Sequence, residues 1–188
     1  MKPITTAFMQ YPQREFDQFM QVISLVMEKT VLQAEAFVRS TNEQRTTEFV
    51  CGAVYNKIID SYPTIEGVTV TQFVTRLGIH MTCDVNVFIT AIQFLDSYCA
   101  KTRLPLVKQV FFRLFFICVV LARKVLEDAK LSIDYLCQVG GFEHETDVKE
   151  LELDVLTVLE WKMTIDENVF WDYHQKIKVW INGENTCR

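Results

Sequence analysis

The chain has 188 residues and a net charge of −5; 49% of its residues are hydrophobic and 14 are phenylalanine. A chain of this length can bury a substantial core, and its 6 glycines and 4 prolines favour long elements with few turns. Because Lys and Arg are scattered and form neither a basic face nor a polybasic patch, no nucleic acid and no membrane is expected as a partner.

Apolar residues recur at helical spacing along the whole chain. The expected helices cover residues 14–40, 49–58, 70–77, 85–98, 106–127, 132–139, 144–161 and 167–181. Thr82 and Ser132 are candidate N-caps, Gly140-Gly141 is expected to end the short helix, and Asn182-Gly183 the last one. No strand-length alternation recurs between glycine-rich turns, so the predicted fold class is all-α.

The nine residues from Leu114 to Ala122 carry no charge. This run is too short to span a bilayer, which takes about 20 residues. A helix that is apolar on every side is typical of a helix enclosed by other helices. Residues 106–127 are therefore predicted to form the central helix of a bundle.

The residues that could carry chemistry are few. None of the six cysteines forms a CxxC motif, so we interpret them as reduced thiols of a cytoplasmic or nuclear protein. His80 and Cys83 have the spacing of a metal-ligand pair, but no second pair completes a site, and neither a metal nor a cofactor is expected. Nucleotide-binding and hydrolase motifs are absent. The sequence therefore favours a protein that acts by binding and not by catalysis.

Two charged residues interrupt apolar stripes of predicted helices. Lys124 follows Val120 by four positions and therefore shares its helix face, and Glu152 lies four positions after Val148. The simplest interpretation is a lysine whose stem covers apolar surface and an acid at the edge of a stripe. The alternative is a charged pair on neighbouring helices that holds the backbone of another protein.

The segments QFLDSYCAKTRLPL (residues 93–106) and LARKVLEDAKLSIDYLCQVGGFEHETDVKELELDVLTVLEWKMTI (residues 121–165) together resemble a cyclin box. In detail they are similar to P/U-type cyclins, the group that includes the fungal phosphate-response cyclin. The resemblance is clear over roughly residues 70–165. Its marks are Leu95-Asp96, Ala122 with Lys124, Gly140-Gly141, Leu151-Glu152 and the run from Leu156 to Trp161.

The resemblance implies a five-helix cyclin box around a central apolar helix, with additional N- and C-terminal helices. The expected division is an N-terminal segment with a flanking helix (1–42), the box (43–165) and a C-terminal helix and tail (166–188). Such a protein is not an enzyme. It is expected to bind a cyclin-dependent Ser/Thr kinase one to one and to activate it by positioning the kinase's regulatory helix.

The resemblance also assigns residue roles. Lys124 is expected to donate to backbone carbonyls of the kinase, and Glu152 to accept from nearby N–H groups. The apolar contact around them is expected from Leu121, Val125 and Leu156.

Two further residues match a family pair that bonds inside the box. By resemblance, Arg76 and Asp96 are expected to form this structural pair and to orient the first two box helices. Arg123 has no assigned role and is expected to be solvated. The segment QFVTRLGI keeps only an arginine and scattered apolar residues of the substrate-docking signature of mitotic cyclins, so docking by that route is not expected.

Two other functions remain open on the sequence. A cyclin-fold protein can act as a scaffold or transcription-related adaptor that binds partners without activating a kinase. A helical enzyme with an unrecognised site is the third possibility. Mixing the purified chain with a kinase separates the three: activation, binding alone, or turnover by the chain alone.

Overall fold

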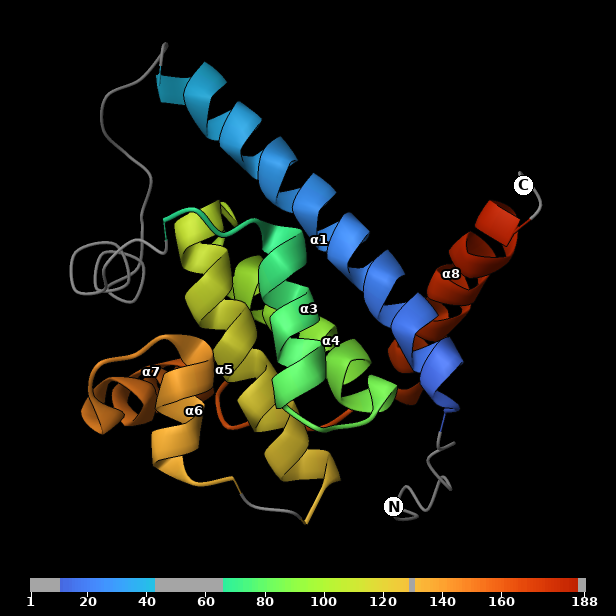
Figure 1. The fold of residues 1–188 in the computed structure, drawn as a ribbon. Coiled ribbons are helices and arrows are strands. Elements are labelled where there is room, and N and C mark those ends of the chain that lie inside the picture. The colour runs from blue at the N-terminus through green and yellow to red at the C-terminus, as the bar shows by residue number, and fades with distance from the viewer. Residues whose placement is uncertain (1–10, 43–65, 129–130, 186–188) are drawn as a thin grey trace.

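The computed structural model describes residues 11–42, 66–128 and 131–185, and within these residues every regular element is a helix (Figure 1). The helices are α1 (Gln13–Asn42), α3 (Val70–His80), α4 (Val85–Thr102), α5 (Lys108–Leu126), α6 (Ile133–Gly140), α7 (Glu145–Val158) and α8 (Glu167–Asn185). The predicted all-α class is confirmed, with α3 to α7 as the five-helix bundle and α1 and α8 as its flanking helices. The helix expected at 49–58 lies outside the described residues.

Helix α5 is the central helix, as the uncharged run predicts. Every residue from Val110 to Arg123 is buried, and α1, α3, α4, α6 and α7 all contact it. Figure 1 shows α5 between α3 on one side and α6 with α7 on the other. Because protein surrounds α5, its phenylalanines replace contacts with water by contacts with neighbouring helices.

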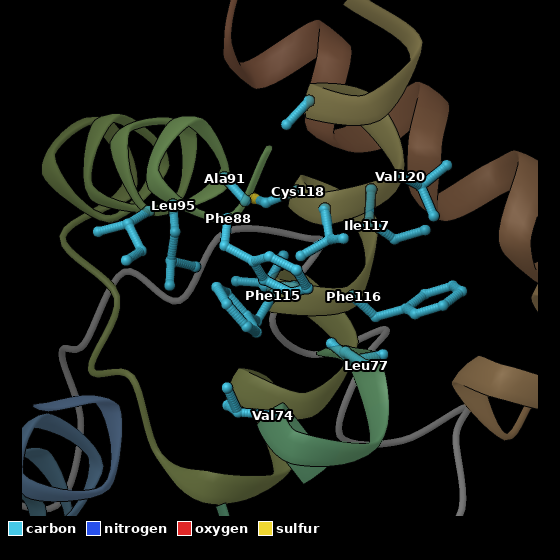
Figure 2. Packing of buried hydrophobic residues seen from close by; sticks show 14 of the residues in the cluster. Val74, Leu77, Phe88, Ala91, Leu95, Phe115, Phe116, Ile117, Cys118 and Val120 are labelled. Atoms are coloured by element: carbon cyan, nitrogen blue, oxygen red, sulfur yellow. The ribbon is translucent and has the colours of Figure 1, made fainter. Parts of the chain in front are cut away.

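The core around α5 is aromatic. Figure 2 shows Phe88 of α4 and Leu77 of α3 approaching the α5 rings of Phe115 and Phe116. The rings of Phe111 and Phe115 stack along α5 with centroids 5.0 Å apart. Such ring pairs add about 0.5–1.5 kcal/mol beyond the area they bury, so the aromatic side chains stabilise α5 as well as filling the core.

Side chains of the preceding residues start α3 and α4. Thr69 forms a capping box with Gln72: its hydroxyl accepts from the Gln72 N–H at 3.0 Å, and the Gln72 side chain accepts from the Thr69 N–H at 2.9 Å. The expected cap at Thr82 is wrong. Asp84 caps α4 by accepting from the N–H of Asn86 at 2.9 Å, while Thr82 lies in the left-handed region, with φ of 47°, where it cannot serve as the N-cap.

The turn after α6 confirms the predicted stop at Gly140-Gly141. Gly141 is the C-cap of α6 with φ of 68°, a conformation that glycine adopts without steric cost. A Cβ on Gly140 would lie 2.8 Å from the ring of Phe116, so any larger residue there would force that ring to shift. Arg113 of α5 then reaches both carbonyls, with Nη1 2.9 Å from the Gly140 oxygen and 2.8 Å from the Gly141 oxygen.

The flanking helices α1 and α8 pack on each other, and both contact α4. Their junction is aromatic: His174 of α8 is buried among the rings of Tyr11, Phe19 and Phe170. Helix α8 continues to Asn185, so the expected end at Asn182-Gly183 is wrong. Within the described part of the chain, no helix combines the length and the apolar character that crossing a bilayer requires.

Candidate partner-binding site

Lys124 lies in the last turn of α5, where the enclosed helix emerges from the bundle. Its neighbours Leu121 and Ala122 are buried, whereas 54% of the Lys124 side chain is exposed. Exposure rises at Lys124 because α5 ends two residues later, at Leu126. A cation at the C-terminal end of a helix also interacts favourably with the helix dipole.

Glu152 lies on α7 beside that end of α5. Val148, Leu151 and Val155 are buried and hold α7 against the bundle, and Glu152, at the edge of this apolar face, keeps only 17% of its side chain exposed. Lys124 Nζ donates to Glu152 Oε1 at 2.5 Å. The structure thus joins the two charged residues that interrupt the apolar stripes, and they form an ion pair across two helices.

This pair keeps unused hydrogen-bonding capacity. An ammonium has three N–H donors, and a carboxylate can accept about four hydrogen bonds; the contact between Lys124 and Glu152 uses one of each. A partner's carbonyl could therefore bind Lys124, and a partner's N–H could bind Glu152, while the ion pair stays closed. Because the lysine is half exposed, the pair itself contributes only about 0–1 kcal/mol to folding.

The three apolar residues expected around the pair differ in what they expose. Val125 is 43% exposed, and Leu156 is partly buried against the core. Leu121 is only 3% exposed, because it still lies inside the enclosed part of α5. Its expected contact with a kinase stays a prediction.

A surface hollow adjoins Lys124. It has a volume of about 480 Å³ and runs between the ends of α3 and α5 and the start of α6. Its lining combines charged and apolar side chains: Met81, Val120, Arg123, Lys124, Glu127, Asp128, Leu131 and Leu136. The hollow is large enough for one or two apolar side chains of a partner, with Lys124 at its rim.

The expected bond between Arg76 and Asp96 is not formed. Arg76 Nη2 donates to the carbonyl of Gln138 at 2.8 Å, and Asp96 accepts a hydrogen bond from the hydroxyl of Tyr173. The reason is the packing: α3 lies mainly against α1, and α4 lies mainly against α5 and also contacts α8. Desolvation raises the pKa of Asp96, and the bond from Tyr173 offsets part of this shift.

Arg123 is the residue whose position the sequence interpretation missed. It is only 6% exposed, and its Nη1 donates to the carbonyl of Met81 at 2.6 Å. Its Nε donates to Glu127 Oε2 at 2.9 Å, a spacing of four residues that was visible in the sequence. The expectation that Arg123 is solvated is wrong, because the loop before α4 covers it.

The described cysteines are free, with Cys83, Cys118 and Cys137 buried and Cys99 partly buried; Cys51 and Cys187 lie outside the described residues. Burial raises the pKa of the Cys83 and Cys99 thiols to about 12. Across residues 11–42, 66–128 and 131–185, no group of three or more His, Cys, Asp and Glu is arranged to hold a metal ion.

Comparison with known proteins identifies the family. Residues 67–164 match the family model of the cyclin N-terminal domain. Cyclin-U1-1 of Arabidopsis thaliana is 24% identical over 155 residues, which cover 81% of this chain and 68% of that protein. Cyclin-U2-1 of the same plant is 27% identical over 168 residues (86% and 69%), and Cyclin-P3-1 of Oryza sativa subsp. japonica is 25% identical over 123 residues (63% and 52%).

The chain therefore belongs to the cyclin family, and the predicted similarity to P/U-type cyclins is confirmed. Members of this family are regulatory proteins and not catalysts.

Proposed function

We propose that this chain is the regulatory subunit of a cyclin-dependent Ser/Thr protein kinase, that it binds the kinase one to one, and that it activates the kinase by positioning its regulatory helix. The proposed compartment is the cytoplasm or the nucleus, where the free thiols of the described cysteines would stay reduced. The nearest alternative is a cyclin-fold scaffold that binds partners without activating a kinase.

The observation that carries the proposal is the Lys124–Glu152 pair. It lies where the central helix emerges, and it combines a half-exposed donor and a mostly covered acceptor with spare hydrogen-bonding capacity. Exposed Val125 and the apolar part of the adjoining hollow add surface that could exclude water around it. Backbone groups at an end of a kinase helix, or in the loop before it, would be suitable partners, since a helix leaves its first N–H groups and its last C=O groups unpaired.

The test uses purified full chain and a panel of purified cyclin-dependent kinases. Wild-type chain should bind at least one kinase and raise its phosphorylation of a protein substrate. Lys124→Ala and Glu152→Ala should each weaken binding about 30-fold or more, because truncating one partner of a desolvated charged contact costs about 2–5 kcal/mol. Activation should fall in parallel at a fixed concentration of the chain.

Lys176→Ala is the matched control. Lys176 forms an exposed pair with Asp172 on α8, with Nζ and Oδ2 2.6 Å apart, away from the α5–α7 edge. Its loss should leave kinase affinity unchanged. Binding without activation would favour the scaffold. Full activation by Lys124→Ala would show that this pair is not the contact.

A further inference from the structure

Two buried arginines, Arg113 and Arg123, lie toward opposite ends of α5, and each donates to backbone carbonyls where a neighbouring helix ends. Arg113, in the first half of α5, donates to the carbonyls of Gly140 and Gly141 at the end of α6. Arg123, in the last turn, donates to the carbonyl of Met81 after α3. Arg113 is 2% exposed and Arg123 6%, and their contacts with the carbonyls of Gly140 and Met81 are shielded from water.

The contact at the Lys124 end is a small network that joins the end of α5 to the loop from Met81 to Asp84. Arg123 donates to Glu127 Oε2, and the other carboxylate oxygen, Oε1, accepts from the backbone N–H of Asp84 at 3.1 Å. Arg123 and Glu127 together therefore bind both ends of this loop, Met81 and Asp84. The N–H of Glu127 also donates to the carbonyl of Arg123 at 2.8 Å, which closes the last turn of the helix.

A helix end normally frays, since its last carbonyls lack partners within the helix. Here the last turn carries Lys124, whose ammonium must meet a partner's backbone within hydrogen-bonding distance. A lysine has a flexible stem of four methylene groups, so a fraying backbone beneath it would add to the entropy lost on binding. Fixing that turn in the free chain reduces this cost.

We propose that Arg123 is a positioning residue for Lys124: by tying the last turn of α5 to the Met81–Asp84 loop, it holds Lys124 in its binding position before the partner arrives. This inference rests on the proposed kinase-binding function. Arg123 does not itself need to touch the kinase. Its planar guanidinium suits the role because it reaches a carbonyl and a carboxylate at once, whereas the ammonium of a lysine would have to meet both from a single atom.

The decisive experiment is a double-mutant cycle on kinase affinity, using the kinase from the panel that binds wild-type chain most tightly. Arg123→Met keeps the apolar stem and removes both donors, and it should weaken binding roughly tenfold. In a Lys124→Ala background the same substitution should weaken binding less than about twofold, because there is no longer a lysine to position. Arg123→Lys should fall between wild type and Arg123→Met, and it serves instead if Arg123→Met does not fold.

Arg113→Lys is the control at the other end of α5. It should lower Tm, but its effect on affinity, measured on folded protein, should be small and should add to that of Lys124→Ala. If Arg123 supported the fold alone, its substitutions would behave in the same additive way. Additive losses for Arg123 and Lys124 would overturn the proposal.

Amide hydrogen exchange on the free chain gives a readout that needs no kinase. Arg123→Met should speed exchange in Lys124, Val125 and Leu126 roughly tenfold, with little change near Arg113. Unchanged exchange in that turn would refute the positioning role even if kinase binding were weakened. If Lys124→Ala bound the kinase like wild type, the proposed function would fail instead, and the exchange data would still decide whether Arg123 holds the turn.

Discussion

The hydroxyl oxygen of Tyr11 lies 2.5 Å from Nε2 of His174, and this contact joins the residues just before α1 to the middle of α8. The imidazole is 2% exposed, and its Nδ1 has no hydrogen-bond partner among the described residues. Burial lowers the pKa of His174, and the positive charge of Lys178 lowers it further. The folded state therefore favours the neutral ring.

This environment predicts acid sensitivity. The unfolded chain binds the proton with the ordinary pKa of about 6.5, and the folded chain binds it only at lower pH. The contribution of neutral His174 to the free energy of unfolding is fully present above the pKa of the unfolded chain. It is lost as the pH falls toward and through the pKa of the folded chain, with a slope of at most about 1.4 kcal/mol per pH unit for one proton. Urea unfolding between about pH 7 and pH 5 measures this slope.

His174→Phe keeps an aromatic ring in the same surroundings and should flatten this part of the pH profile. Tyr11→Phe is the control, since it removes the hydroxyl but leaves the buried imidazole. An unchanged profile in His174→Phe would assign the acid sensitivity to other groups.

The close approach at Gly140 predicts a strong effect of adding one methyl group. Its Cβ would lie 2.8 Å from ring atoms of both Phe116 and Phe142, and overpacking of this kind costs about 1–3 kcal/mol. Gly140→Ala should lower Tm accordingly. Gly183→Ala is the matched control, because nothing lies within 4 Å of its Cβ position and α8 continues through it; alanine should be neutral or stabilise by up to about 1 kcal/mol.

The thiols predict a labelling pattern. Cys83 and Cys99 have pKa values raised to about 12 by burial, and the pKa of the fully buried Cys118 is raised as well. Since the thiolate is the reactive form, a maleimide at neutral pH should modify these three cysteines only after unfolding. Peptide mapping by mass spectrometry distinguishes each site. Rapid modification of Cys118 in folded protein would contradict the packing of α5.

The separate partners of Arg76 and Asp96 predict independent energetics. In a double-mutant cycle on unfolding free energy, Arg76→Ala and Asp96→Ala should add within about 0.3–0.5 kcal/mol. Asp96→Ala and Tyr173→Phe should instead show a coupling of about 1 kcal/mol, the usual net value of a hydrogen bond, since the Tyr173 hydroxyl donates to the Asp96 carboxylate. A coupling of about 1 kcal/mol between Arg76 and Asp96 would instead indicate that these two residues interact directly.

Local physical chemistry determined much of this protein from its sequence alone. A helix that is apolar on every side is unfavourable in water, so the run from Leu114 to Ala122 predicted an enclosed helix, and the structure buries it completely. The stop at Gly140-Gly141 and the cap at Ser132 follow from conformations and hydrogen bonds within a few residues. The family was suggested separately, by the resemblance of Leu95-Asp96, Ala122 with Lys124, Gly140-Gly141 and Leu151-Glu152, in that order and spacing, to a cyclin box.

The tertiary structure decided which polar groups meet. Helical spacing says which residues share a face of one helix, but not which faces of two helices are opposed, so the partners of Arg76 and Asp96 could not be read from their positions. Arg123 is the clearest case. A guanidinium can be buried only where acceptors meet it, and one of its acceptors is the carbonyl of Met81, 42 residues earlier in the chain. A backbone carbonyl is present at every residue, so only the packing of the loop against α5 could select that one.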